Sequence, residues 1–147
     1  MSDRRITLDQ IMPVILDQLA EGKSVRIYPN GTSMLPMIRQ GIDSVELSPV
    51  SGALKKYDLP LYQRAGGQYV LHRIVKVGQT YTCIGDNQTA YEPGISQEQI
   101  LAVVTGFYRK DKYRSVKSPD YWLYCRFWHW TRKLRVYWSI VKKQLKR

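Results

Sequence analysis

The chain has 147 residues, of which 44% are hydrophobic and 24% are charged, a composition that fits one domain with a modest core and excludes a disordered chain. Its formal net charge of +11 predicts an anionic partner, such as lipid headgroups, nucleic acid or an acidic protein. Cys83 and Cys125 lie far apart and outside any CxxC pair, and the chain has only two histidines, so we expect neither a structural zinc site nor another metal or cofactor.

The N-terminal segment contains apolar residues but no continuous apolar run. Asp9, Gln10, Pro13 and Asp17 interrupt it, so it does not have the pattern of a signal peptide. No window of about 18 uncharged apolar residues occurs in the chain, so no transmembrane helix is expected. Both absences favour a cytoplasmic protein.

Residues 7–21 predict a helix, with Thr7 as the N-cap and Gln10 in the capping-box position. Pro13 is expected to kink or weaken this helix, and Glu21-Gly22-Lys23 ends it. The apolar residues recur at helical spacing: Leu8, Ile11, Met12, Ile15, Leu16 and Leu19.

Between Ser24 and Gly106 the chain has the pattern of short strands separated by turn residues. Gly66-Gly67 predicts a hairpin turn between two of them. Several short strands with closely spaced turns indicate a mainly β fold, with a barrel or sandwich core. The predicted strands are residues 24–28, 44–47, 59–63, 69–77, 81–84 and 100–108.

A composition shift near Ser118-Pro119 marks the best internal boundary. The segment from Asp120 to Arg147 has eight basic residues and one acidic residue, so it carries +7 of the net charge of +11. We therefore divide the chain into residues 1–118, a helix plus β core, and residues 119–147, a basic amphipathic tail. Residues 119–146 of this tail are expected to form a helix.

All four tryptophans of the chain lie in the tail. Because Trp and Tyr favour the membrane–water interface and Lys and Arg favour anionic headgroups, we prefer an amphipathic helix lying on an anionic membrane surface. Two alternatives stay open. The aromatic face packs on the β core or on a second subunit, or the tail binds RNA or single-stranded DNA by base stacking and phosphate contacts. Nucleic acid is the less favoured partner because the aromatic stretch contains no glycine.

Three polar side chains stand out in the β region: Ser33 in NGTSMLP, His72 in YVLHRIV and Asp86 in CIGDNQT. Each has a structural explanation when taken singly. Ser33 can bend the chain before Pro36, a lone histidine in a strand is commonly a surface or core residue, and Gly-Asp-Asn is a common turn sequence.

Taken together, the three segments resemble the motifs of the type I signal peptidase superfamily, over residues 25–108. Ser33-Met34-Leu35-Pro36 is similar to the nucleophile motif. His72-Arg73 falls where bacterial leader peptidases carry Lys-Arg and where the archaeal and endoplasmic-reticulum members carry histidine. Gly85-Asp86-Asn87 is similar to the late acidic motif.

This resemblance implies a mechanism in which Ser33 is the nucleophile, His72 the general base and Asp86 the acid that orients the imidazole. With an ordinary pKa near 6.5, a histidine can take the serine proton at neutral pH, so activity is expected to fall below about pH 6.5. In the relatives with histidine, a second acidic residue follows the Gly-Asp-Asn motif. The matching position here is Glu92, a supporting candidate, and Arg73 is expected to be a structural ion-pair partner.

One departure from the family concerns the oxyanion hole. Many members place a hydroxyl residue two positions before the nucleophile, where this chain has Gly31. The backbone N–H of Ser33 can still donate, with Thr32 or a neighbouring amide as the other donor. The loss of one such donor commonly costs about 10²–10³ in rate.

We therefore expect a small cytoplasmic serine endopeptidase, peripheral on the inner face of the membrane. The resemblance implies that it cleaves a leader or signal-like peptide bound as an extended strand. The alternative is a catalytically degenerate peptide-binding module that the basic tail docks on a membrane surface or on nucleic acid, and Gly31 favours this alternative slightly.

Overall fold

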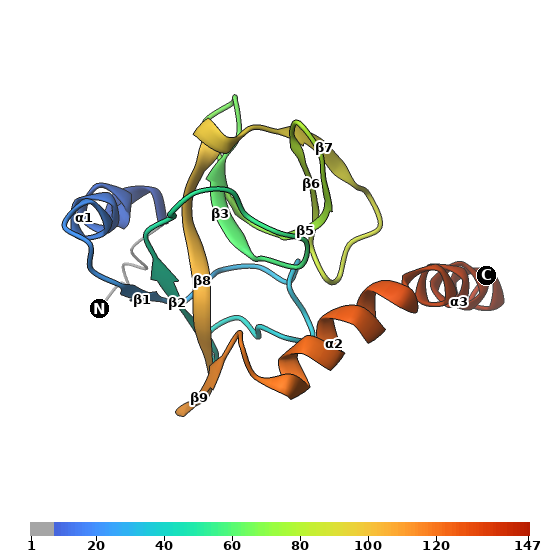
Figure 1. The fold of residues 1–147 in the computed structure, drawn as a ribbon. Helices are drawn as coiled ribbons and strands as arrows, with labels where there is room; N and C mark the ends of the chain where they lie inside the picture. The colour runs from blue at the N-terminus through green and yellow to red at the C-terminus, as the bar shows by residue number, and fades with distance from the viewer. Residues whose placement is uncertain (1–7) are drawn as a thin grey trace. The chain divides into compact units, whose positions relative to one another are not determined.

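The computed structural model describes residues 8–147, and this part of the chain is mainly β, with two antiparallel sheets and three α-helices (Figure 1). The mainly β class predicted from the sequence is confirmed. Within the described residues the strands form two open sheets and no closed barrel. The chain divides into two compact units, one ending at Val116 and the other spanning Lys117–Arg147.

The larger sheet has six strands: β1 (Val25–Ile27), β2 (Ser44–Ser48), β3 (Pro60–Gln63), β4 (Tyr69–Leu71), β8 (Ile100–Arg109) and β9 (Lys112–Ser115). The long strand β8 lies at its centre. β2 pairs along one edge of β8, whereas β3 and β9 pair with different halves of the other edge. β4 pairs only with β3, so it ends the row of strands on that side.

The smaller sheet has three strands, in the order β5 (Arg73–Val77), β6 (Tyr81–Ile84) and β7 (Glu92–Ile95). A short 3-10 helix, η1 (Gln97–Gln99), leads from β7 into β8. The sequence did not predict β7 because Pro93 and Gly94 are types depleted in strands. The strand nevertheless pairs with β6 and places Glu92 opposite Cys83.

Residues 69–77, predicted as one strand, form two strands that belong to different sheets. β4 pairs with β3 in the larger sheet, β5 pairs with β6 in the smaller one, and His72 lies between them. The prediction of one strand is wrong because residue types that favour strands lie on both sides of His72, so the sequence shows no break at the crossing. Val70 and Ile74, on either side of His72, are both buried in the same hydrophobic cluster.

This hydrophobic cluster draws its side chains from both sheets. Full burial of one such large apolar side chain stabilises the fold by about 1.5–3 kcal/mol, so the cluster holds the two sheets together at the place where the chain passes between them. Its buried members are Leu54, Tyr62, Val70, Ile74, Tyr81, Cys83 and Ile95.

The N-terminal helix α1 spans Leu8–Ala20, close to the predicted range of 7–21. Its buried residues Met12, Ile15 and Leu19 lie on one face, as the helical spacing predicted. Pro13 lies inside the helix, which continues to Ala20. The predicted N-cap, Thr7, lies outside the described residues.

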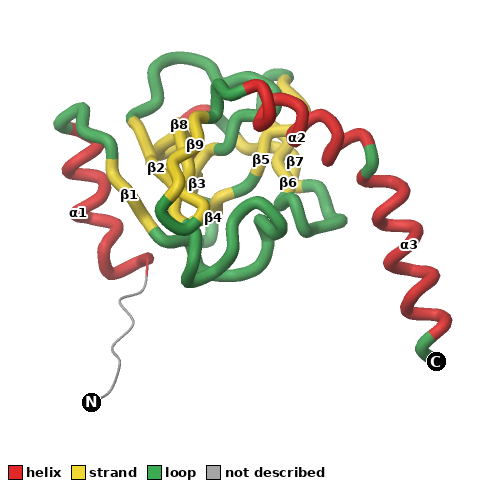
Figure 2. Tube along the Cα trace, turned by 90° about the horizontal axis from the view of Figure 1, so that it is seen from below, coloured by secondary structure: helices red, strands yellow, loops and turns green. Residues whose placement is uncertain are grey.

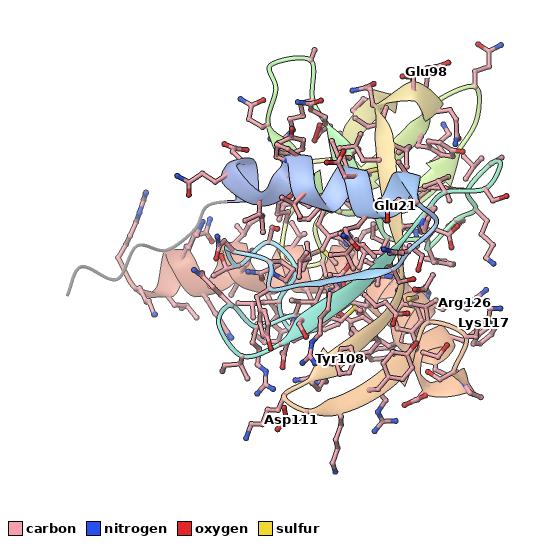
Figure 3. The ribbon with its side chains drawn as sticks, turned by 90° about the vertical axis from the view of Figure 1, so that its left-hand side faces the viewer. Glu21, Glu98, Tyr108, Asp111, Lys117 and Arg126 are labelled. Carbon is pink, nitrogen blue, oxygen red and sulfur yellow. The ribbon has the colours of Figure 1, made fainter. Side chains whose placement is uncertain are left out.

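β8 and β9 form a hairpin, and Figure 3 shows Tyr108 and Asp111 near its tip. β9 was not predicted. Within β8, Gly106 makes room for the Tyr113 side chain on β9, since a Cβ there would lie 2.4 Å from Tyr113 Cε2 and from its hydroxyl oxygen. The Tyr113 ring also packs against the Tyr108 ring, with 5.2 Å between centroids. A strand glycine thus marks close approach of a neighbouring aromatic side chain.

The tail, predicted as one helix, forms two helices, α2 (Pro119–Trp130) and α3 (Arg132–Leu145) (Figure 2). The break falls at Thr131, whose side-chain hydroxyl donates to the Phe127 carbonyl at 2.8 Å. Threonine hydroxyls compete in this way with the backbone pattern of a helix and bend it. Among residues 8–147, no helix has the length and apolar character needed to span a membrane.

Candidate active site

Ser33 lies in the turn that follows β1. The turn is entered through Gly31, which has a φ of +91°, a left-handed conformation that favours glycine. A residue with a Cβ at this position would therefore be strained. Within the described residues the N–H of Ser33 makes no hydrogen bond, so it is free to act as an oxyanion donor.

The segment Gly85-Asp86-Asn87, directly after β6, supports the Ser33 turn through the backbone. Asn87 N–H donates to the Ser33 carbonyl at 2.8 Å, and Asn87 Nδ2 donates to the Thr32 carbonyl at 3.1 Å. A Cβ at Gly85 would lie 2.6 Å from the Ser33 carbonyl oxygen, closer than real Cβ contacts come. Glycine at 85 and asparagine at 87 therefore shape the turn that presents the hydroxyl.

Asp86 forms a buried ion pair with Arg73. Arg73 Nε donates to Asp86 Oδ1 at 2.8 Å and Arg73 Nη2 donates to Asp86 Oδ2 at 2.9 Å, and the two residues are 2% and 0% exposed. Arg73 Nη1 also donates to the Tyr57 carbonyl at 3.1 Å. The ion pair predicted for Arg73 is present. Asp86 and His72 do not form a hydrogen bond in the structure. The contact by which Asp86 was predicted to orient the imidazole is therefore not present.

His72 is only 5% exposed, and its ring nitrogen Nδ1 lies 3.4 Å from the Tyr62 hydroxyl. Burial, followed by the positive charge of Arg64, lowers the pKa of His72 to about 4, although the charges of Glu92 and Asp86 oppose this shift. The imidazole is therefore neutral at pH 7, the form that can accept a proton. The expected pKa near 6.5 is corrected downward because His72 is buried at the crossing between two sheets.

Glu92, the supporting acidic candidate, contacts Tyr62 and Arg64. The Tyr62 hydroxyl donates to Glu92 Oε2 at 3.0 Å, and Arg64 donates to both carboxylate oxygens, with an Nη2–Oε2 distance of 2.8 Å. These Arg64 hydrogen bonds lower the pKa of Glu92 below its ordinary value. Glu92 is thus an anion, separated from His72 by the Tyr62 phenol.

Ser33 and His72 line the same cavity, which has a volume of about 580 Å³. Ser33 Oγ makes no hydrogen bond within residues 8–147, to His72 or to any other group. A second, shallower hollow of about 640 Å³ is also lined by His72, and Arg64 and Gln88 line both. The apolar wall of the first cavity includes Ile11, Ile27, Met34, Leu61, Val70 and Leu71.

Sequence reasoning missed Tyr62 and Arg64. The observed hairpin register brings them to His72, since Tyr62 pairs with Val70 and His72 lies two residues further along the same face. Residues diagonal to each other on one face of an antiparallel pair lie within reach of aromatic and long side chains. A two-residue turn at Gly66-Gly67 would instead pair Tyr62 with Leu71, on the other face. The observed loop is one residue longer, with Arg64 N–H donating to the Gln68 carbonyl, and only this register places Tyr62 and Arg64 on the face of His72.

Among the described residues there is no group of three or more side chains that could hold a metal ion. Comparisons with protein-family models, with curated proteins and with solved structures found no match to this chain. The function is therefore inferred from the geometry of the cavity and its walls.

Proposed function

We propose that the chain is a serine endopeptidase of signal-peptidase type, with Ser33 as the nucleophile and His72 as the general base. The observation that carries the proposal is the cavity lined jointly by Ser33 and by a neutral, buried His72. A serine hydroxyl becomes a useful nucleophile when a neighbouring base takes its proton, and a neutral imidazole is the commonest such base.

In this mechanism Ser33 Oγ attacks the carbonyl carbon of the scissile peptide bond while His72 accepts the hydroxyl proton. His72 then gives this proton to the leaving amine, and water, deprotonated in turn by His72, releases the acyl group from Ser33. Because Ser33 Oγ and His72 are not hydrogen-bonded in the free chain, substrate binding must bring them together. Such contacts commonly tighten when substrate binds.

The oxyanion that forms during attack needs donors at the Ser33 turn. The N–H of Ser33, which makes no hydrogen bond in the described chain, is one candidate donor. Gly31, two residues before it, has a left-handed backbone conformation. A hole with one donor fewer costs about 10²–10³ in rate, so we expect a slow enzyme. Asp86 and Arg73 take a supporting role here, since their ion pair anchors the loop that holds the Ser33 turn.

The proposed substrate is a leader or signal-like peptide bound as an extended strand, as the family resemblance implies. Two features support this choice. β4 ends the row of strands in the larger sheet, and its residues Tyr69, Val70 and Leu71 line the cavity next to His72. An edge strand offers unpaired backbone groups to an added strand, and the apolar wall suits small apolar side chains. The finer fold class proposed is accordingly a signal-peptidase-like core.

The experiment that tests this function incubates the full chain with a diverse peptide library and reads the cleaved bonds by mass spectrometry. Wild-type protein should cut after a restricted set of small residues, and Ser33→Ala should abolish every cut. Ser96→Ala is the matched control, because Ser96 lies at the start of η1 and does not line the cavity. Full cleavage by Ser33→Ala would overturn the proposal.

The second candidate function is a peptide-binding module with a degenerate site. The absence of a Ser33–His72 hydrogen bond in the described chain and the glycine at position 31 favour it. Such a module would retain a library peptide in equilibrium dialysis but leave it intact. Ser33→Ala would then bind and release the same peptides as wild type.

We also propose that residues 119–147 hold the protein on the inner, anionic face of a membrane. The observation behind this proposal is the pattern of α3, where exposed apolar side chains recur at spacings of three and four. Lys133, Arg135, Lys142 and Lys143 of α3 lie outside this stripe, as in helices that lie in the interface plane. The apolar stripe of α3 consists of the exposed Leu134, Tyr137, Trp138 and Leu145 and the half-buried Val141.

A further inference from the structure

A chain of four side chains runs from the surface to the proposed base. Arg64 donates two-pronged hydrogen bonds to Glu92, Glu92 accepts from Tyr62, and the Tyr62 hydroxyl reaches His72 Nδ1 at 3.4 Å. The Tyr62 and His72 rings meet edge to face, with 6.4 Å between centroids and 72° between planes. The three outer residues come from β3, from the turn that follows it and from β7, so tertiary contacts bring them together.

The chemistry of Glu92, Tyr62 and His72 decides which group donates and which accepts in each of these hydrogen bonds. Glu92 is a carboxylate and can only accept, so the Tyr62 hydroxyl hydrogen points to Glu92. The Tyr62 oxygen then has only lone pairs to offer on its other side. A contact with His72 Nδ1 is favourable only if Nδ1 carries the hydrogen, which leaves Nε2 with a free lone pair.

We infer that Tyr62 is a positioning residue, which fixes the Nδ1–H tautomer of His72 and leaves Nε2 as the proton acceptor, and that Glu92 and Arg64 hold the Tyr62 hydroxyl in the required direction. This inference rests on the proposed function only for its catalytic consequence, because the tautomer is a property of the free chain. Glu92 thus acts on His72 through the Tyr62 hydroxyl. In a Ser-His-Asp triad, by contrast, the carboxylate bonds to the histidine directly.

Two further features support this assignment. Tyr62 is fully buried, and burial raises the pKa of its phenol well above the ordinary value, so the hydroxyl keeps its proton at every physiological pH. The Arg64 hydrogen bonds hold the pKa of Glu92 below its ordinary value, so at pH 7 Glu92 is a carboxylate that accepts from Tyr62. Because the Tyr62 hydroxyl keeps its proton and donates it to Glu92 at pH 7, the Tyr62 oxygen can only accept from His72 Nδ1.

The charged groups that bear on His72 come from three segments. Arg64, after β3, opposes protonation of the ring, whereas Glu92 on β7 and Asp86 after β6 favour it. The carboxylates therefore stabilise the imidazolium that forms when His72 takes the serine proton. Burial of the ring, and after it the charge of Arg64, outweigh the carboxylates in the free chain, so the ring stays neutral before the reaction begins.

Nitrogen NMR of the histidine rings tests the inference directly. The chain has only two histidines, and His72→Gln assigns the resonances. At pH 7, wild-type His72 should show a protonated Nδ1 and an unprotonated Nε2. Tyr62→Phe should redistribute the proton between the two nitrogens and lower kcat about tenfold with little change in KM, the effect of one lost hydrogen bond.

Tyr81→Phe is the matched control for the loss of a buried phenol. The Tyr81 hydroxyl belongs to the same hydrophobic cluster but bonds to the Leu54 N–H at 2.9 Å and to Gln97 at 2.6 Å, away from His72. Its removal should cost comparable stability and leave the His72 tautomer unchanged. Arg64→Met supplies a third measurement, since it should move the His72 titration to higher pH.

Each outcome separates this inference from the proposed function. A wild-type ring protonated at Nε2, or a Tyr62→Phe spectrum identical to wild type, would overturn the positioning role whether or not the chain cleaves peptides. A tautomer that changes in Tyr62→Phe and not in Tyr81→Phe supports the role even if no peptide is cleaved, in which case only the peptidase proposal fails.

Discussion

The backbone N–H of Asn87 donates to the carbonyl of Ser33 at 2.8 Å, and this bond ties the turn that carries the hydroxyl to the loop after β6. The same loop carries Asp86, whose carboxylate accepts two hydrogen bonds from the guanidinium of Arg73. Gly85-Asp86-Asn87 therefore supports Ser33 mechanically, and the acidic residue of the motif is part of that support.

Gly85→Ala should damage the site from outside the cavity. A Cβ at this position would lie 2.6 Å from the Ser33 carbonyl oxygen, so the Ser33 turn must shift. A shift of about 1 Å in a nucleophile can cost about 10²-fold in rate, and overpacking costs about 1–3 kcal/mol of stability. Peptide cleavage and urea unfolding of the same variant measure the two effects.

Gly78→Ala is the control for this substitution. A Cβ at Gly78 would meet the Thr80 carbonyl oxygen at 3.7 Å, an ordinary contact. This variant should cleave as wild type does. If Gly85→Ala also cleaves normally, the motif does not support the Ser33 turn in the way described here.

Asp86→Asn should destabilise the fold strongly, because it leaves the Arg73 guanidinium buried without its counter-charge. Removal of one partner from a buried ion pair costs about 3–5 kcal/mol in the free energy of unfolding. Glu21→Gln, which breaks the exposed pair between Glu21 and Lys23, should cost no more than about 1 kcal/mol. Equal costs in urea unfolding would contradict the structural role of the Asp86–Arg73 pair.

Much of this arrangement could be predicted from the sequence, and the failures have identifiable causes. The spacing of Met12, Ile15 and Leu19 predicted the buried face of α1, because helical periodicity is a local property. The change of sheet at His72 could not be predicted, because residue types that favour strands lie on both sides of it, Val70 and Leu71 before and Ile74 and Val75 after. Thr131 breaks the tail helix through one side-chain hydrogen bond, which periodicity does not reveal.

The candidate site was predicted in its parts but not in its contacts. Ser33 and His72 were chosen from motif order, and they line one cavity. Asp86 was assigned to His72 because a triad needs an acid, yet its hydrogen bonds go to Arg73. The pairing of Asp86 with Arg73 and of Glu92 with Arg64 depends on how the two sheets pack. Motif order along the chain does not show that packing.

The activity should persist to lower pH than an ordinary histidine would allow. With its pKa lowered to about 4, His72 stays neutral at pH 7 and should remain so down to about pH 5. The value of kcat/KM should therefore be level between about pH 7 and pH 5 and fall by half near pH 4, the pKa of the free base. An acid limb centred near pH 6.5 would show that the ring is solvated and would contradict its burial.

The same shift predicts a loss of stability in acid. In the unfolded chain His72 binds a proton near pH 6.5, whereas in the folded chain it does so only near its lowered pKa of about 4. The unfolded state thus holds more protons between these values, so the free energy of unfolding falls as pH drops from about 6.5 to about 4. His72→Gln should flatten this part of the stability profile, measured by urea unfolding at several pH values.

Membrane docking should depend on the apolar stripe of α3. Trp138→Asp removes an exposed apolar side chain from the stripe, and full burial of such a group is worth about 1.5–3 kcal/mol, or about tenfold or more in binding. Co-sedimentation with phosphatidylglycerol-containing vesicles should weaken accordingly, while phosphatidylcholine vesicles should bind poorly from the start.

Ile140→Asp is the matched control, because Ile140 is also exposed but, two residues on from Trp138, lies on the opposite side of the helix and outside the apolar stripe. Its vesicle binding should stay close to that of wild type. Equal weakening by both substitutions, or unchanged binding after deletion of residues 119–147, would exclude the lipid-binding role. Tighter retention on single-stranded RNA than on vesicles would identify nucleic acid as the partner.

Labelling with a serine-reactive fluorophosphonate, followed by mass spectrometry of the adduct, tests directly whether His72 activates Ser33. Wild-type protein should form a single adduct on Ser33, which is lost in Ser33→Ala and forms at least tenfold more slowly in His72→Gln, because the general base contributes about 10²–10⁴ in rate. An unlabelled Ser33, or labelling that proceeds equally fast in His72→Gln, would contradict a Ser33–His72 peptidase.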